Sequence, residues 1–261
     1  MREIATLDEL KLIELNIMEK IHDFCASNKL TYYLSHGTLI GAIRHQGFIP
    51  WDDDIDIFMP RSDYNLFLLQ KDRFEKEYSN IEIVNHNSRI RFMRPISKVI
   101  DSRTILLEKE YVGDDSIGVF VDIWPLDGCP RLDLIYNLHV FQLKLYQKIL
   151  YSKIKRTKSF FDKILLKVCK LNRHEVIEKI IRKSCQYSFE ESEYVTCYVD
   201  GYVRKFRRDW FGDGKKVLFE SRCFLVPENY DRVLHCLYGN YKKMPPPDKQ
   251  IPHHISDIWW K

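Results

Sequence analysis

Apolar residues recur at helical spacing close to the start of the chain. Five of them, from Leu10 to Phe24, lie three or four positions apart and follow a capping-box sequence that begins at Thr6. Because this period places them on one face of a helix, we predict a helix over about residues 7–28.

The middle of the chain has the pattern of β-strands. Its apolar runs are rich in β-branched and aromatic residues and are bounded by turn-forming residues, which is typical of strands in a sheet. We predict strands at residues 31–35, 54–57, 81–85, 91–100, 104–108 and 119–124. Short helices are expected between the first three of these strands, at about residues 38–45 and 62–71.

The pattern changes again after residue 131. Residues 132–188 contain few glycines and prolines and predict two long helices. A strand at 217–225 and a helix at 227–238 are expected next, and the proline-rich tail after Met244 predicts little regular structure.

This order of elements predicts an α+β fold in which helices flank a mixed β-sheet. We expect one domain over residues 1–261, with a core at about 1–130 and 191–261 and a helical lobe at about 131–190.

Composition narrows the class of protein. The 261 residues are 45% hydrophobic and 13% aromatic, as in a folded globular protein, and a net charge of +4 does not call for a nucleic-acid partner. The seven cysteines form no Cys-x-x-Cys pair, so neither a zinc site nor a disulfide framework is indicated. Neither a signal peptide nor an apolar run of about 18 residues is found, so we expect a cytoplasmic protein.

The helical lobe is basic. Between Arg131 and Glu190 there are 14 Lys and Arg against 5 Asp and Glu, an excess of 9. The run from Lys153 to Lys158 leads into apolar residues at helical spacing, and such a helix can lie on an anionic membrane surface. The lobe is therefore a candidate for peripheral contact with the inner face of a membrane. The alternative is that the helix packs on its own domain and leaves its basic face in water.

Four aspartates within five positions are the strongest chemical signal. Asp54 and Asp56 alternate with isoleucines, and in a strand they would point to the same face and need a shared counter-charge. In sites that bind phosphate groups, Mg²⁺ is the common counter-charge for such a pair of carboxylates. Asp52 and Asp53 would then shape the turn or cap the next helix. A calcium loop fits poorly because Ile57 occupies the position that needs glycine.

Two further groups complete a possible phosphate site. His36, Gly37 and Thr38 lie between a predicted strand and a predicted helix, where backbone N–H groups can hold phosphate oxygens. Asp122 lies within an apolar strand, where a buried carboxylate needs a partner. That partner is either a metal shared with Asp54 and Asp56 or a Lys or Arg side chain.

The spacing of these groups resembles the nucleotidyltransferase superfamily of the polymerase-β type. More narrowly, residues 33–64 resemble the signature of the LicD family, whose core is shared with fukutin-type ribitol-phosphate transferases. Other stretches over nearly the whole chain resemble the same family: residues 98–104, 118–127, 218–220, 226–227, 238–241, 245–246 and 253–254. Gln46 and Phe58 depart from it, since a small residue is often expected at each position.

The resemblance implies a nucleotidyltransferase-like core and a phosphotransferase activity. It implies transfer of a phospho-alcohol, above all phosphocholine, from a CDP-linked donor to a hydroxyl of a cell-surface glycan or its lipid-linked precursor, with release of CMP. Teichoic acid and lipopolysaccharide are acceptors of this kind. It further implies that Asp54, Asp56 and Asp122 hold Mg²⁺ or Mn²⁺, and that Asp122 accepts the proton of the attacking hydroxyl.

The remaining substrate contacts are expected from residues near these motifs. Cations would neutralise the donor phosphates, and aromatic faces would hold a quaternary ammonium group. The candidates are Arg44, Lys98, Arg103, His253, His254, Trp51 and Trp124.

Other readings of the same residues remain at this point. A nucleotidyltransferase that releases pyrophosphate, or a glycosyltransferase with an Asp-x-Asp metal site, would also use paired carboxylates. A non-catalytic scaffold is disfavoured because it has no electrostatic reason to keep uncompensated acids. The sequence does not separate choline from glycerol, ribitol or ethanolamine donors.

Overall fold

The computed structural model describes residues 2–4, 6–88, 92–107, 117–155, 157–201, 203–252 and 257–261. Its centre is a mixed β-sheet in which β3 and β7 are parallel and the other pairs are antiparallel. The strand order is β2 (Tyr33–Leu34), β3 (Ile55–Pro60), β7 (Phe120–Cys129), β5 (Ser97–Asp101) and β4 (Ile81–Val84). The far end of β7 also pairs with β8 (Tyr194–Thr196), which pairs with β9 (Phe206–Arg207).

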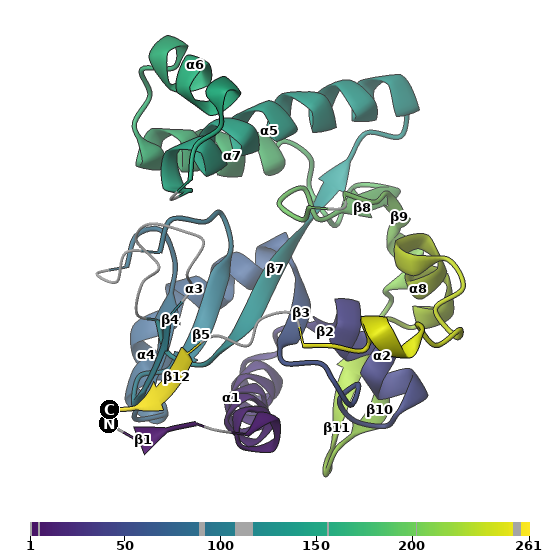
Figure 1. The fold of residues 1–261 in the computed structure, drawn as a ribbon. Helices are drawn as coiled ribbons and strands as arrows, with labels where there is room; N and C mark the ends of the chain where they lie inside the picture. Colours follow the sequence, from purple (N-terminus) through teal and green to yellow (C-terminus); the bar gives the residue numbers. More distant parts are fainter. Residues whose placement is uncertain are drawn as a thin grey trace.

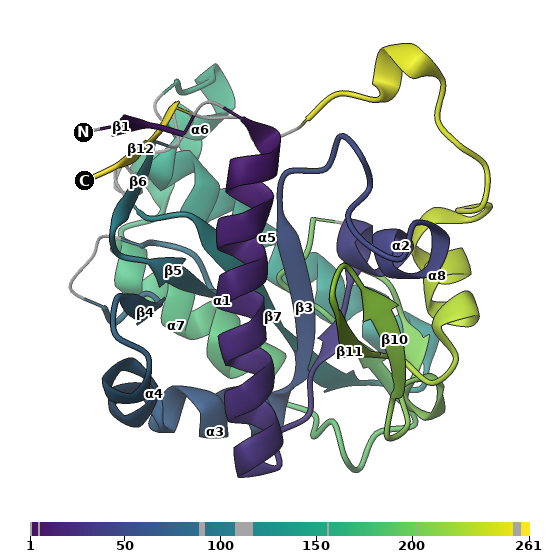
Figure 2. The same ribbon diagram turned by 90° about the horizontal axis from the view of Figure 1, so that it is seen from below.

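Helices cover this sheet, and the predicted α+β class is confirmed. Helix α1 (Leu7–Asn28) has the predicted bounds, because Thr6 caps its first turn and Lys29 ends it in a left-handed conformation. It lies along β3, β5 and β7 (Figure 2). Helix α2 (His36–Arg44) follows β2 directly. The helix expected at 62–71 is two helices, α3 (Arg61–Leu69) and α4 (Lys71–Glu77).

The described residues of the helical lobe form three helices, so the prediction of two long ones was wrong. They are α5 (Asp133–Ile154), α6 (Phe160–Val168) and α7 (Arg173–Ser184), and they lie together above the sheet in Figure 1. New helices begin at Ser159 and Asn172 because each residue forms a capping box with the acid three positions on.

The last part of the chain differs from the prediction in two places. The single strand expected at 217–225 is a hairpin, β10 (Lys215–Phe219) and β11 (Arg222–Val226), because the chain turns back at Glu220 with φ +56°. Helix α8 (Tyr230–Tyr238) follows.

The tail is more regular than expected. Strand β12 (Asp257–Trp260) lies between β1 (Arg2–Glu3) and β6 (Thr104–Leu107), which brings the two ends of the chain together (Figure 1). Short 3-10 helices occupy Arg208–Trp210 and Pro247–Lys249. Among the described residues, no helix is both long enough and apolar enough to span a membrane.

Candidate active site

A row of charged residues crosses the centre of the sheet. Asp56 on β3 is in register with Asp122 on the parallel strand β7, and Asp122 is in register with Lys98 on β5 (the strands are labelled in Figure 1). All three side chains are buried, and Lys98 Nζ lies 3.0 Å from Asp122 Oδ1. Asp122 therefore has the lysine partner that was one of the two expected outcomes. Lys98, expected at the donor phosphates, neutralises this carboxylate.

Asp56 is held by two aromatic side chains. Trp124 Nε1 donates a hydrogen bond of 2.7 Å to Asp56 Oδ1, and His36 Nδ1 lies 3.8 Å from Asp56 Oδ2. Burial raises the pKa of Asp56 to about 6 against the opposing effect of His36, and the charge of Asp122 raises it further. Trp124 and His36 thus lie against Asp56, and their expected contacts with the substrate stay a prediction.

The other ring nitrogen of His36 reaches a residue that sequence reasoning missed. His36 Nε2 lies 3.2 Å from Oδ2 of Asp200, which is 164 positions away in the loop between β8 and β9. Burial lowers the pKa of His36, but the bond to Asp200 and the charges of Asp56 and Asp54 outweigh burial, so the net shift is upward. No motif surrounds Asp200, so nothing in the sequence indicated this contact.

His36, Gly37 and Thr38 form the first turn of α2 and not a turn that precedes it. Thr38 Oγ1 is buried and accepts a 2.9 Å hydrogen bond from the backbone N–H of Asp56, so it joins α2 to β3. A Cβ atom on Gly37 would lie only 2.5 Å from Asp52 Oδ2. Glycine at position 37 therefore makes room for the Asp52 carboxylate.

The acidic run groups differently from the prediction. Among the described residues, Asp54 shares a possible ion-binding group with Asp52 and Asp53, whose ligand oxygens lie within 4.8 Å of one another. Asp54, Asp56 and Asp122 do not form such a group there. Strand β3 begins at Ile55, one residue after Asp54, so the strand alternation that was expected to pair Asp54 with Asp56 does not reach Asp54.

The electrostatics of this group suit a divalent cation. Burial raises the pKa of Asp52 to about 7, and the charges of Asp54 and Asp53 add to this effect. Burial also raises the pKa of Glu14 on α1, and the same aspartates contribute. Asp52 Oδ2 and Glu14 Oε2 are buried without a hydrogen-bond partner among the described residues. Repelling carboxylates with unsatisfied oxygens are what a hard cation stabilises.

Two cations lie close to Asp52. Lys11 and Arg44 both lower the pKa of Asp52 by their charge. Lys11 Nζ donates to the backbone oxygens of Ile49 and Pro50, at 3.2 and 2.9 Å, and Arg44 Nη1 donates to Tyr241 O at 3.0 Å. From the sequence, Arg44 was expected at the donor phosphates, which stays a prediction, whereas no role was expected for Lys11.

Four other residues were expected from the sequence to contact the substrate: Arg103, Trp51, His253 and His254. Arg103 pairs with Asp101 in the turn after β5 and lies over the Trp260 ring, so the structure does not bring it to the aspartates. Trp51 is half-buried and packs against the core beside the acidic run. His253 and His254 lie outside the described residues.

Tyr238, at the end of α8, faces the same acids. Nearly half of its surface is exposed (46%), yet loss of hydration around the hydroxyl raises its pKa. The charges of Asp56, Asp200, Asp52 and Asp54 raise it further. This position lies in one of the stretches on which the family resemblance rests, but no role had been expected for it.

Taken together, the site combines a group of carboxylates with buried and partly buried cations at one end of the parallel pair β3 and β7. The carboxylates can hold a divalent ion, and Arg44 and Lys11 can balance negative charge near it. Chemistry at a phosphate group needs this combination, because the reaction depends mainly on positioning and charge neutralisation.

Comparison with known proteins gives a family and a full-length relative. Residues 29–149 match the family model described as LicD/FKTN/FKRP, nucleotidyltransferase domain. The chain is 31% identical over 265 residues to the lipopolysaccharide cholinephosphotransferase LicD of Haemophilus influenzae, covering 97% of this chain and 98% of that protein. An uncharacterised protein of Rickettsia typhi is 41% identical over 58 residues, which are 22% of this chain and 19% of that protein.

Proposed function

Because this chain belongs to the LicD family of phosphotransferases, we propose that it transfers phosphocholine from a CDP-linked donor to a hydroxyl of a cell-surface glycan, and that CMP is released. The similarity to a cholinephosphotransferase over 97% of the chain carries this proposal. The grouping of Asp52, Asp53 and Asp54 beside Asp56 supports it, since a CDP-linked donor is a diphosphate that needs a counter-charge.

In this proposal, Asp52, Asp53 and Asp54 hold Mg²⁺ or Mn²⁺. The buried, unsatisfied Asp52 oxygen and the closeness of the three carboxylates fit such an ion. When bound, the ion would neutralise the donor diphosphate and stabilise the leaving CMP. Arg44 and Lys11 would balance the remaining negative charge.

We propose that Asp56 accepts the proton of the attacking hydroxyl. Asp122, the acceptor first expected from the sequence, is already engaged by Lys98, whose Nζ lies 3.0 Å from Asp122 Oδ1. Burial raises the pKa of Asp56, and Trp124 orients the carboxylate through a hydrogen bond of 2.7 Å from Nε1 to Asp56 Oδ1. His36, fixed by Asp200, holds the other side of Asp56 and would orient it further.

The choline group would lie against aromatic rings. The partly buried ring of Trp124 lies beside Asp56, to which its Nε1 donates a hydrogen bond of 2.7 Å. A quaternary ammonium is attracted to such a face by about 0.5–2 kcal/mol. Trp51 is a further candidate because it directly precedes the acidic run in the sequence. His36 is not part of this surface, because its raised pKa favours a cation that would repel the choline group.

The experiment that tests this function compares donors. CDP-choline, CDP-glycerol, CDP-ribitol and CDP-ethanolamine would each be added with Mg²⁺ in a thermal-shift assay, because a ligand of the folded state raises its melting temperature. We expect CDP-choline to give the largest rise. A larger rise with another donor would mean that the transferred group is the phospho-alcohol of that donor and not phosphocholine. No rise with any donor would contradict the proposal.

The same assay can be extended to the reaction. Asp54→Asn and Asp56→Asn should each lower CMP release by at least about 100-fold with little change in the unfolding free energy. Asp72→Asn, at an exposed position of α4, is the matched control and should keep full activity. Retained activity in both site variants would refute the assigned roles.

A true nucleotidyltransferase is the second candidate, because the matching family model is described as a nucleotidyltransferase domain. Such an enzyme would transfer the nucleotide and release pyrophosphate from a nucleoside triphosphate. Detection of pyrophosphate in place of CMP would favour it.

We further propose that the lobe contacts the inner face of an anionic membrane, where lipid-linked acceptors would lie. Four large apolar residues of α5 are exposed at helical spacing: Leu134, Leu138, Phe141 and Leu145. Phe160, Phe161 and Ile164 on α6 are also exposed, and exposed lysines lie on both helices. Exposed apolar residues on a basic segment are typical of helices that insert into the surface of an anionic membrane.

A further inference from the structure

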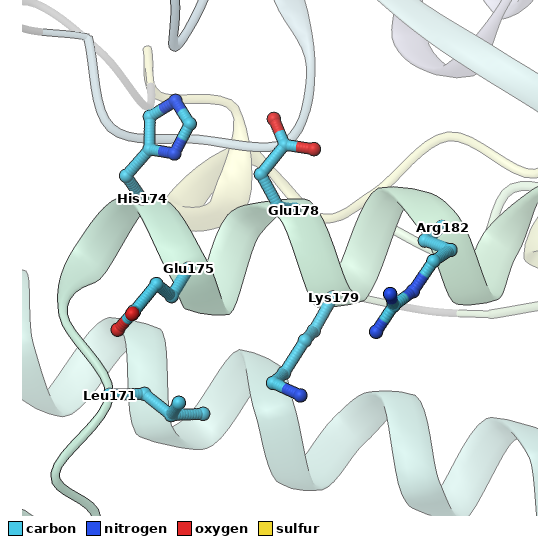
Figure 3. A pocket seen from close by; sticks show the side chains of 6 residues that line it. All are labelled: Leu171, His174, Glu175, Glu178, Lys179 and Arg182. Atoms are coloured by element: carbon cyan, nitrogen blue, oxygen red, sulfur yellow. The ribbon is translucent and has the colours of Figure 1, made fainter.

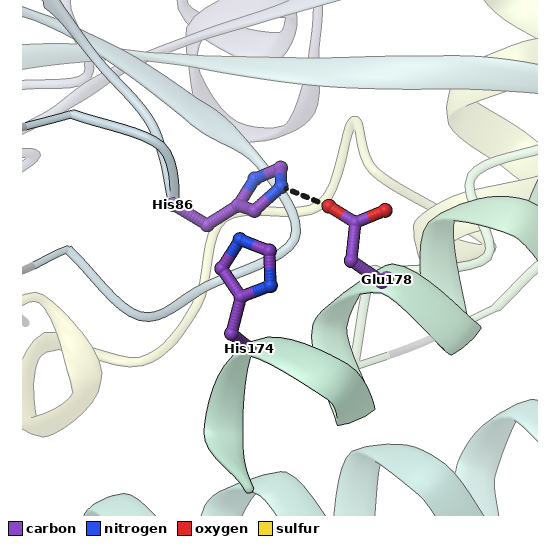
Figure 4. Close-up of side chains that lie close together, drawn as sticks. All are labelled: His86, His174 and Glu178. Carbon is purple, nitrogen blue, oxygen red and sulfur yellow. Dashed lines mark hydrogen bonds and ion pairs between the residues drawn. The ribbon is translucent and has the colours of Figure 1, made fainter.

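We propose that His86, His174 and Glu178 form a second metal site, for Zn²⁺, at the junction between the core and the helical lobe. Each residue offers one ligand atom, and the three atoms lie within 4.8 Å of one another. His86 is in the loop after β4, whereas His174 and Glu178 are four positions apart on α7 (Figure 4). The site would therefore join two elements that the chain places 88 residues apart.

The donor set is one that zinc prefers. Two imidazoles and one glutamate are a known zinc ligand set, in which the fourth position is left to water or another ligand. Mg²⁺ does not suit these residues, because it takes oxygen ligands and keeps its waters. The expectation that zinc is absent was based on cysteine spacing alone and did not consider histidine.

The side chains already converge. His86 Nε2 lies 2.8 Å from Glu178 Oε1, and the centroids of the two imidazole rings are 5.5 Å apart. His174 Nε2 donates to Asn87 Oδ1 at 3.0 Å. Since the proton then lies on Nε2, the lone pair of His174 is on Nδ1, and the bond to Asn87 orients the ring as outer hydrogen bonds do at zinc sites.

Both supporting elements are held in place. In the loop of His86, the backbone N–H of Asn87 donates to Asn85 Oδ1 at 2.9 Å, and that of Ser88 to Asn85 O at 2.9 Å. The first turn of α7 is fixed by the capping box of Asn172 and Glu175. Ligands on stiff elements lose little entropy when the metal binds, which favours affinity.

A cavity of about 410 Å³ borders the proposed site, because two of the ligands are among the residues that line it. It is lined by Leu171, His174, Glu175, Glu178, Lys179 and Arg182. Figure 3 shows that His174 and Glu178 lie on one side of α7, and that Glu175 and Lys179 lie on the other side. Two of the ligands thus reach solvent at the edge of the cavity, where a water molecule can occupy the fourth position.

The test measures zinc binding to the whole protein in the presence of excess Mg²⁺. Excess Mg²⁺ would compete with zinc for carboxylate sites such as Asp52–Asp54 but not for imidazoles, so the zinc that remains bound reports on the proposed site. We expect one equivalent of Zn²⁺ per chain by metal analysis after gel filtration. His86→Ala, His174→Ala and Glu178→Gln should each weaken binding at least about tenfold.

His235→Ala is the matched control. His235 and Asp231 are also four positions apart on a helix, with His235 Nδ1 3.3 Å from Asp231 Oδ2. This pair belongs to no three-ligand group among the described residues, so its loss should not change the zinc stoichiometry.

A second readout separates this site from zinc bound elsewhere. If the ion joins α7 to the loop of His86, zinc should slow hydrogen exchange of the amides in residues 173–184, and Glu178→Gln should remove this protection. Absence of a zinc equivalent in the unmodified protein, or unchanged binding in all three variants, would overturn the proposal. Protection of α7 that persists in Glu178→Gln would overturn it as well.

Discussion

Glycine is needed at position 37 because the Asp52 carboxylate lies close to its backbone. Its position in the first turn of α2 does not need a left-handed backbone, but a Cβ atom would lie 2.5 Å from Asp52 Oδ2. The sequence indicated that Gly37 mattered and suggested a phosphate-binding turn as the reason. In the structure, Gly37 controls the position of an acidic side chain of the proposed metal group.

We predict that Gly37→Ala lowers both activity and stability. In an open helical position this change would stabilise the helix by up to about 1 kcal/mol. Here the displaced Asp52 should cost about 1–3 kcal/mol, as overpacking does, and CMP release should fall at least about tenfold. Urea unfolding and CMP assays check this. Gly201→Ala is the control, since nothing lies within 4 Å of its added Cβ. Equal effects at both glycines would contradict the argument.

At the scale of elements, a buried ion pair joins α3 to β7. Arg61 donates two hydrogen bonds, of 2.7 and 2.8 Å, to Asp127, whose side chain is fully buried. The pair raises the pKa of Arg61, because the attraction of Asp127 outweighs the opposing effect of burial. It lies just beyond the last register pair of β3 and β7, Pro60 and Leu126, at the other end of the parallel strands from Asp56 and Asp122.

Arg61→Met should lower the unfolding free energy by about 3–5 kcal/mol, because Asp127 would be left buried without its partner. The exposed pair of Arg207 and Asp209 gives the contrast, and Arg207→Ala should cost only about 0–1 kcal/mol. Urea denaturation measures both values. Similar losses for the two variants would mean that Arg61 does not hold a buried charge.

The bounds of elements were predicted well where local signals are strong. The helix over 7–28 begins and ends as expected because its cap and its period are both in the sequence. The lobe and the hairpin after 214 were predicted less well. Their boundaries depend on capping boxes at Ser159 and Asn172 and on a turn at Glu220. These signals were missed because the apolar pattern continues across each boundary.

For the whole molecule, the exposed apolar surface of α5 and α6 predicts binding to vesicles. The protein should sediment with vesicles that contain anionic lipid, less with neutral vesicles, and less as salt is raised, because salt screens the lysines. Leu138→Glu with Phe141→Glu should lower binding about tenfold or more. Leu69→Glu is the control, since Leu69 is 81% exposed but lies on α3. If binding depends neither on lipid charge nor on the double substitution, the proposal that α5 and α6 contact the membrane is refuted.

The sequence alone determined the class of fold and the family, and it located the acidic run, whereas the roles it assigned to single aspartates stay predictions. Periodicity and caps are local properties, and the residues from Tyr33 to Tyr64 lie in one continuous signature. The tertiary structure decided how the charges are shared: Lys98 pairs with Asp122, Asp200 holds His36, and Asp52 lies over Gly37. These contacts join residues that are far apart in the chain or depend on a fraction of an ångström. They follow from strand register and packing, which the order of residues does not express locally.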